Sequence, residues 1–330
     1  MAKQLITFSL LIVLIFSTFL VQAHQNNMNR KDGYHQDNFY TLFQPTLEKP
    51  KATILILHGM QEHSGRYEEL AQHLLNQGFA VLTYDHIGHG KSVKDESGYG
   101  FFQKKKPAQR LIDDAASMAQ LLDSIFPAIP HFVLGHSMGS FITRCLLQEK
   151  SKNFNGAIIV GTGGKVNGMG MFRSYLAIKN TLTPHAKNKM INRTFSTINN
   201  KKFKNEEDVD GTNWLSVSKE NRENFKNDPL NGRDFSNNGF YGLIQLQTRA
   251  TRKTWAKNIS KSFPLLFISG KDDPIGDFGK GVQKTVQSLK NNGFTDVQSQ
   301  IHPHARHEIL NEENRQEAFE QIRIWLQSQL

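Results

Sequence analysis

Short apolar runs alternate along the chain with longer segments in which apolar residues recur every three or four positions. Runs of the first kind indicate buried strands, and segments of the second kind indicate amphipathic helices. The predicted strands are residues 53–57, 79–84, 131–134, 157–160, 265–269 and 296–301. The predicted helices are residues 67–77, 107–125, 138–149, 279–291 and 311–328. This alternation predicts an α/β protein with a mostly parallel central sheet flanked by helices.

The alternation stops between residues 165 and 262, where no strand pattern is present. Apolar anchors at 169–176, 214–217 and 240–246 are what a packed helical insertion needs. A structureless loop of this length is uncommon inside a compact domain, so a helical lid is favoured over a floppy loop. The predicted organisation is a signal peptide at 1–23, a core in two parts at 24–164 and 263–330, and the lid at 165–262.

The N-terminus has the layout of a secretory signal peptide. Lys3 precedes an apolar run at residues 5–21, and Val21-Gln22-Ala23 supplies small residues before the polar start at His24. Retention as a membrane anchor is the alternative, although the run is marginal for a bilayer core of about 30 Å. The sequence therefore predicts a cleaved signal and an exported protein, secreted or periplasmic.

The composition describes an ordinary globular protein and argues against several classes of function. The 330 residues are 38% apolar and 21% charged, and the formal net charge is +10, which favours anionic surfaces or substrates. We find no zinc-type Cys/His spacing, RNA-binding signature or Walker loop, so no cofactor, metal or nucleic-acid partner is expected. Cys145 is the single cysteine, so no disulfide can form within the chain.

The stretch Gly135-His136-Ser137-Met138-Gly139 fits the pattern G-x-S-x-G between a predicted strand and a predicted helix. Glycines on both sides permit the tight turn that lifts a nucleophilic serine above the carboxyl edge of a sheet. The helix N-terminus beside it favours negative charge. Ser137 is therefore the predicted nucleophile, and His136 is expected to point away from the cleft.

A second break follows the strand at 53–57, in the stretch "ILILHGMQEHSGRYEEL". Acyl transfer needs backbone N–H groups that bind the oxyanion, one from the residue after the nucleophile and one from the loop after an earlier strand. These donors are predicted to be the amides of Met138 and Met60. His58 is interpreted as a structural residue that holds the loop.

A serine nucleophile needs an acid and a base, which follow it along the chain in that order in this arrangement. After the strand at 265–269, Asp273 is the preferred acid because the next residue, Pro274, holds it extended. Asp272 is the main alternative, and Asp277 lies within the next turn.

The base is sought in the stretch "IHPHARHEILNE", which contains three histidines. His302 is predicted to end a strand, and His304 follows a proline. His307 lies in the loop before the last predicted helix, where its imidazole can reach both partners. His307 is therefore the preferred base.

The motifs "HGMQEHSGRYEEL", "YDHIGHGKS", "GHSMGS" and "HEILNE" resemble the monoacylglycerol lipase and lysophospholipase branch of the α/β-hydrolases, also described as serine aminopeptidase-like. The resemblance covers about residues 35 to 328. It implies an α/β-hydrolase fold and the same assignment: Ser137, Asp273 and His307 as the triad, and the Met60 and Met138 amides as oxyanion donors. Two features depart from it: Ser140 stands where a further glycine is usual, and residues 179–204 are rich in Lys and Asn.

The leading hypothesis is an exported serine esterase that cleaves single-chain acyl lipids such as monoacylglycerols or lysophospholipids. Contact of the basic lid with an anionic membrane is a further expectation. The alternative within enzymes is a peptidase that releases N-terminal residues, which needs an acidic group for the substrate amine. A non-catalytic binding protein is the third hypothesis, and the complete set of site residues argues against it.

Overall fold

The computed structural model describes residues 28–330 except 47, 167 and 207, and the strands described form one eight-stranded sheet. The strand order is β1-β2-β4-β3-β5-β6-β7-β8. The strands are β1 Met28–His35, β2 Asn38–Pro45, β3 Thr53–Leu57, β4 Ala80–Tyr84, β5 His131–His136, β6 Gly156–Val160, β7 Leu265–Gly270 and β8 Val297–His302. All neighbours from β4 to β8 pair in parallel, whereas β1–β2 and β2–β4 are antiparallel.

All six predicted strands are confirmed to within two residues at each end, but the two N-terminal strands were missed. β1 reads MNRKDGYH, a polar stretch without alternation, so its sequence carries no strand signal. It forms an edge strand because every residue pairs with a residue of β2, and β2 in turn pairs with β4. Pairing between strands thus determines this hairpin more than local preference does.

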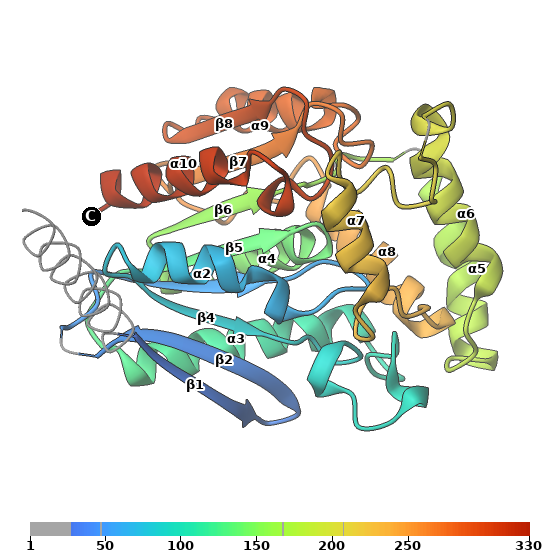
Figure 1. Cartoon of the computed structure of the whole chain (residues 1–330), viewed down its shortest axis with the longest axis horizontal. Helices are drawn as coiled ribbons and strands as arrows, with labels where there is room; N and C mark the ends of the chain where they lie inside the picture. Colours follow the sequence, from blue (N-terminus) through green and yellow to red (C-terminus); the bar gives the residue numbers. More distant parts are fainter. Residues whose placement is uncertain (1–27, 47, 167, 207) are drawn as a thin grey trace, which may run out of the picture.

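Five helices flank the sheet, as predicted: α2 Glu68–Leu75, α3 Pro107–Ile125, α4 Met138–Lys150, α9 Lys280–Asn291 and α10 Arg315–Ser328. The prediction for the last helix began too early, at residue 311. Ile309–Asn311 form a separate 3₁₀ turn, and α10 begins four residues later, at Arg315. Figure 1 shows these helices lying along the strands.

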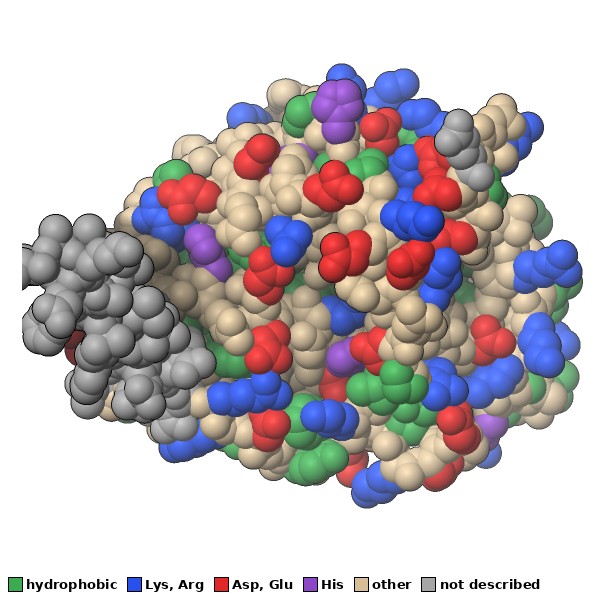
Figure 2. Space-filling view, in the orientation of Figure 1, with side chains coloured by type: hydrophobic (Ala, Val, Ile, Leu, Met, Phe, Trp, Pro, Cys, Tyr) green, Lys and Arg blue, Asp and Glu red, His purple; other side chains and the backbone are tan. Residues whose placement is uncertain are grey.

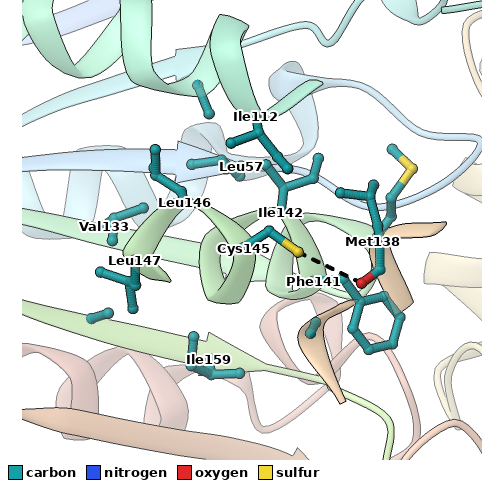
Figure 3. Close-up of a cluster of buried hydrophobic side chains, with 14 of the residues drawn as sticks. Leu57, Ile112, Val133, Met138, Phe141, Ile142, Cys145, Leu146, Leu147 and Ile159 are labelled. Carbon is teal, nitrogen blue, oxygen red and sulfur yellow. Dashed lines mark hydrogen bonds between the residues drawn. The ribbon is translucent and has the colours of Figure 1, made fainter. Parts of the chain in front are cut away.

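The two faces of the sheet bury alternate residues of each central strand, as the two-residue period of a strand requires. In β3, Ile54 and Ile56 pack with α2 and α10, whereas Leu55 and Leu57 pack with α3 and α4. Figure 3 shows the second cluster, in which side chains of α4 lie among those of β3, β5, β6 and α3. Sγ of the buried Cys145 lies 3.6 Å from the Leu246 carbonyl oxygen, which joins α4 to the following insertion.

The segment between β6 and β7 is helical, as expected, and the floppy-loop alternative is wrong. It contains α5 Met169–Leu182, α6 Lys189–Asn200, α7 Lys219–Asn227 and α8 Asn237–Ala250. α8 packs against α3 and α4, and α5 packs against α8. Figure 1 shows these helices beyond the carboxyl ends of the strands, with α5 and α6 outermost. The proposed domain boundaries at 164 and 262 remain predictions.

The N-terminal residues 1–27 lie outside the described part, and so does the predicted signal peptide at 1–23. Among the residues that the structure describes, no helix is both long enough and apolar enough to cross a bilayer.

Candidate active site

The chain turns sharply where β5 ends and α4 begins. Ser137 lies between them with φ 53° and ψ −117°, and backbone strain of this kind costs about 1–3 kcal/mol. Gly139 makes the turn possible, because a Cβ there would overlap the carbonyl oxygens of Leu57 and His58. The predicted strand–turn–helix elbow is therefore present, with Ser137 at the N-terminal end of α4.

Three side chains from distant parts of the chain meet at the carboxyl edge of the sheet. Nε2 of His307 lies 2.8 Å from Oγ of Ser137, and Nδ1 of His307 lies 3.0 Å from Oδ1 of Asp273. Asp273 is fully buried, and its Oδ1 also accepts the Ile275 N–H at 2.8 Å. Because an ionised carboxylate only accepts, Nδ1 of His307 carries the proton and Nε2 can accept the Ser137 hydroxyl proton.

Neither alternative acid is hydrogen-bonded to His307. The Asp272 side chain is 38% exposed and pairs with Nζ of Lys202 at 3.2 Å. Asp277 lies in a turn with φ 51°, and its amide donates to the Pro274 carbonyl. The position preferred from the sequence, Asp273, is the one that the fold brings to the imidazole.

The alternative bases are also directed elsewhere. Nε2 of His302, at the end of β8, is hydrogen-bonded to Oε1 of Gln321 in α10 at 2.9 Å. His304 is an exposed residue with φ 54°. Only His307 of these three histidines contacts Ser137.

The loop after β3 packs directly on Ser137. A Cβ built on Gly59 would lie 3.0 Å from Cβ of Ser137 and 2.6 Å from Oε1 of Glu62, so a larger residue would displace the loop. The Met60 amide has no acceptor among the described residues. Met138 is the first residue of α4, so its amide lies outside the helical hydrogen-bond ladder. Both amides are thus available, and their role as oxyanion donors remains a prediction.

We expect Gly59→Ala to lower kcat for a nitrophenyl ester by about 10²-fold, because losing one oxyanion donor has effects of this order. The added methyl group must push against Glu62 and Ser137 and so displaces the Met60 amide. Steady-state kinetics of purified protein measure the effect. Gly170→Ala is the matched control, because its new Cβ meets open space. Equal kcat values for wild type and Gly59→Ala would contradict the assignment of this loop.

Sequence reasoning missed a buried carboxylate, Glu62, that holds the same loop. Its Oε1 accepts the Gly59 N–H at 2.6 Å and the Tyr67 hydroxyl at 2.8 Å, and it lies 3.1 Å from Nδ1 of His136. Its Oε2 pairs with Arg66 at 2.9 Å. Burial alone would raise the pKa of Glu62, but the hydrogen bond from His136 and the charge of Arg66 hold it well below its usual value. Glu62 is therefore an anion that fixes the loop beside Ser137.

Arg66 extends this network to the loop of the candidate base and to α7. Its guanidinium forms two hydrogen bonds with Glu308, at 2.6 and 2.7 Å, and donates to Oδ1 of Asn221 at 2.9 Å. Glu308 directly follows His307, so the pairing helps to place the imidazole. The one sequence signal was the presence of Glu62 and Arg66 within the distinctive stretch "QEHSGRYEEL".

His136, within the elbow, has both ring nitrogens hydrogen-bonded to protein groups. Its Nδ1 lies 2.9 Å from the Tyr67 hydroxyl, and its Nε2 donates to the His307 carbonyl at 3.1 Å. Burial would lower the pKa of His136, but the hydrogen bond and charge of Glu62 raise it. His136 is among the residues that line the cavity, and the centroid of its ring lies 4.9 Å from that of His307. Both ring nitrogens are thus hydrogen-bonded to buried protein groups, and the expectation that His136 points away from the cleft remains a prediction.

His58 is structural, as interpreted from the sequence. Its Nδ1 donates to the Gly59 carbonyl at 2.8 Å, and its Nε2 accepts the His86 N–H at 3.0 Å. The rings of His86 and His89 pack around it. Burial lowers the pKa of His58 well below its usual value, that of His86 to about 3 and that of His89 to about 4. The cluster is therefore neutral in the folded protein at neutral pH.

This cluster makes the fold sensitive to acid. In the unfolded chain, His86 and His89 have a pKa of about 6.5, whereas in the folded protein these values are about 3 and about 4. Their contribution to stability is therefore complete above pH 6.5, and it is lost as the pH falls through the range between the unfolded and folded values. Because each of the two histidines binds a proton only in the unfolded chain over this range, we expect the free energy of unfolding to fall by roughly 2 kcal/mol per histidine from pH 7.5 to pH 5. Urea unfolding at both pH values measures the difference.

His89→Phe should reduce this pH dependence. Nε2 of His89 has no partner among the described residues, and its ring stacks on Phe102, so a phenyl ring fits the site. The exposed His185→Phe is the control and should keep the wild-type difference between the two pH values. An unchanged pH dependence in His89→Phe would contradict the burial of a neutral imidazole.

A cavity of about 90 Å³ opens in front of Ser137. Its wall is formed partly by the insertion, through Asn192 and Phe195 of α6 and through Trp214. The Trp214 ring covers that of His307, with centroids 5.0 Å apart and planes at 30°. Within the described part of the chain, no group of three or more His, Cys, Asp or Glu side chains could hold a metal ion.

Comparison with known proteins gives one matching family model and several relatives. The family described as "Serine aminopeptidase, S33" matches residues 48–314. A monoglyceride lipase homolog of Monkeypox virus is 28% identical over 297 residues, which is 88% of this chain and 94% of the relative. The rat monoglyceride lipase is 36% identical over 111 residues, and this match spans only 34% of the chain and 35% of the rat protein.

Solved structures share the fold over nearly the whole chain. A thermostable carboxyl esterase from Bacillus coagulans, in complex with glycerol, superposes with a TM-score of 0.81 at 24% identity and covers 91% of this chain and 98% of its own. A soluble variant of monoglyceride lipase from Saccharomyces cerevisiae, in complex with a substrate analog, gives a TM-score of 0.69 at 19% identity, with 92% and 96% covered. These likenesses confirm the expected α/β-hydrolase fold.

Proposed function

The chain belongs to the serine aminopeptidase S33 family of α/β-hydrolases, and we propose that it cleaves carboxylic esters of single-chain acyl lipids through an acyl-enzyme on Ser137. Its similarity to monoglyceride lipases identifies it as a carboxylic ester hydrolase. The nucleophile and the lipid class are inferences from the site. The observation that carries them is the continuous chain of hydrogen bonds from Asp273 through His307 to Ser137, at 3.0 and 2.8 Å.

In the proposed mechanism, Oγ of Ser137 attacks the ester carbonyl while Nε2 of His307 takes its proton. The Met60 and Met138 amides bind the oxyanion of the tetrahedral intermediate. Asp273 holds the imidazolium, which then gives its proton to the departing alcohol as the ester C–O bond breaks. Water attacks the acyl-enzyme with His307 as base, and the fatty acid leaves as the proton returns to Oγ.

The cavity supports a single-chain substrate. Apolar walls are provided by Phe195, Trp214 and Leu215, and Gln61 and Asn192 supply amide groups at the same site. A volume of about 90 Å³ is small beside the roughly 300–1,000 Å³ of typical ligand pockets. It holds the ester group and the start of an acyl chain, so a long chain fits only if the helices over the cavity shift.

The family description raises the peptidase alternative, but none of the described residues that line the cavity is an unpaired acid for a substrate amine. Two carboxylates of the described part of the chain line this cavity, those of Glu62 and Glu308. Both are bonded to Arg66, at 2.9 and 2.6 Å, and Glu62 also accepts the Gly59 N–H. An incoming ammonium group would have to break this buried network, which favours esters over aminoacyl amides. A purely binding role has less support, because the catalytic groups are in hydrogen-bonding contact.

A substrate panel tests the function, with Ser137→Ala as the blank. We expect monoacylglycerol or lysophospholipid to be hydrolysed with a higher kcat/KM than diacylglycerol or an aminoacyl p-nitroanilide. Preferential cleavage of the anilide, with monoacyl lipids untouched, would replace this proposal with the peptidase.

A further inference from the structure

The charged side chains in the segment from residue 165 to residue 205 are all positive. The segment contains nine Lys or Arg residues and no Asp or Glu. Lys202 pairs with Asp272, and Lys187 donates to the Tyr99 carbonyl. Six others are exposed and form no salt bridge with a described carboxylate: Lys165, Arg173, Lys189, Arg193, Lys201 and Lys204. Figure 2 shows Lys and Arg side chains along the edge of the molecule formed by α5 and α6, with hydrophobic side chains between them.

The outer side of α5 is apolar although it faces solvent. Met171, Tyr175, Ile178 and Leu182 are 82, 38, 61 and 72% exposed. Their spacing of four, three and four residues places them on one face of the helix, while Leu176 is fully buried. Apolar side chains that gather in one exposed patch mark an interaction surface, whereas single scattered ones need no explanation.

α6 continues this surface and connects it to the candidate active site. Met190 and Ile198 are 66 and 65% exposed. Asn192 and Phe195 of the same helix line the cavity in front of Ser137. One helix therefore separates the outer surface from the reaction centre.

We propose that the outer faces of α5 and α6 form a docking face for an anionic lipid bilayer. The apolar side chains enter the boundary between headgroups and acyl chains, and the surrounding Lys and Arg side chains contact lipid phosphates, as in interfacial amphipathic helices. The proposal rests on the proposed function, because docking would place α6 and the cavity behind it next to single-chain lipids in the membrane.

The charge decides between a bilayer and a second copy of this chain as the occupant. Two copies meeting through this face would bring two carboxylate-free basic segments together, and like charges oppose such contact. An anionic bilayer offers acyl chains for the apolar stripe and phosphates for the Lys and Arg side chains.

Vesicle sedimentation tests the docking face, with Ser137→Ala in every protein so that no lipid is consumed. All proteins compared have the same N-terminal residues, so any contribution of residues 1–27 to vesicle binding is the same in each. We expect binding to phosphatidylcholine vesicles that contain phosphatidylglycerol, and much weaker binding without it. Lys189→Glu with Arg193→Glu should weaken this binding at least tenfold, since each cation near the surface contributes about fivefold. Ile178→Ser with Leu182→Ser should do the same.

The matched control residues lie on exposed surfaces of α9 and α10, outside the insertion. Lys284→Glu with Lys290→Glu changes two exposed lysines of α9, and Ile324→Ser changes a 53% exposed side chain of α10. Both should bind vesicles as well as the parent protein. With Ser137 restored, the docking-face variants should hydrolyse a soluble nitrophenyl ester at the wild-type rate, which separates failed docking from failed catalysis.

Equal binding to vesicles with and without phosphatidylglycerol would overturn the proposal, as would an equal loss of binding in the control variants. A dimer in solution that the Ile178→Ser and Leu182→Ser changes dissociate would assign the face to a second copy instead.

Discussion

Ser137→Ala is expected to lower kcat for ester hydrolysis by about 10⁵- to 10⁶-fold, the loss seen when a serine nucleophile is removed from a complete triad. The hydroxyl is the only group in the proposed mechanism that can form the acyl-enzyme, and His307 at 2.8 Å would be left without the proton donor that it activates. Steady-state and single-turnover kinetics with a nitrophenyl ester measure the change.

Ser140→Ala is the matched control for this substitution. Ser140 is buried in the same helix and donates from Oγ to the Ser137 carbonyl at 2.5 Å, so its loss affects packing but not the reacting atoms. We expect its kcat to stay within about tenfold of wild type, because one lost hydrogen bond is a small effect. Circular dichroism should show both variants folded. Turnover by Ser137→Ala at the wild-type rate would remove Ser137 from the reaction.

Asp273→Asn should lower kcat by about 10⁴-fold while preserving the fold, as the equivalent change does in other serine triads. The carboxylate accepts from Nδ1 of His307 and from the Ile275 N–H. An asparagine amide can turn its NH₂ group towards Nδ1 and so favour the tautomer that puts the proton on Nε2, where it blocks the serine.

Asp272→Asn provides the decisive contrast, because it makes the same chemical change one residue earlier. Asp272 is partly exposed and pairs with Lys202, away from the imidazole, and surface ion pairs contribute about 1 kcal/mol or less. We expect near-wild-type kinetics. A large loss in Asp272→Asn with little change in Asp273→Asn would reverse the assignment of the acid.

The sequence was most informative where local pattern and chemistry coincide. The buried strands are short apolar runs, and G-x-S-x-G around Ser137 specifies a strand, a tight turn and a helix within a few residues. The structure places Ser137, Asp273 and His307 together because they follow strands whose carboxyl ends meet at one edge of the sheet. The topology of parallel strands therefore made these three positions predictable.

The missed features depend on contacts between distant residues. β1 is a polar stretch that becomes a strand only through pairing with β2. Arg66 lies 242 positions from Glu308 in the sequence, so the hydrogen bonds between them cannot be predicted from local spacing. The contact of Trp214 with His307 likewise requires the path of the insertion. A helical insertion was predictable from its apolar anchors, but not the side chains that it turns towards the cavity.

In the proposed mechanism, Ser137 carries an acyl group during turnover. The most direct measurement is to quench the protein with acid during hydrolysis of an excess of ester, digest it and locate the acyl group by peptide mass spectrometry. We expect one acyl group per chain, on the peptide that contains Ser137, and none in Ser137→Ala. An acyl group on another residue, or burst turnover without any covalent acyl group, would contradict it.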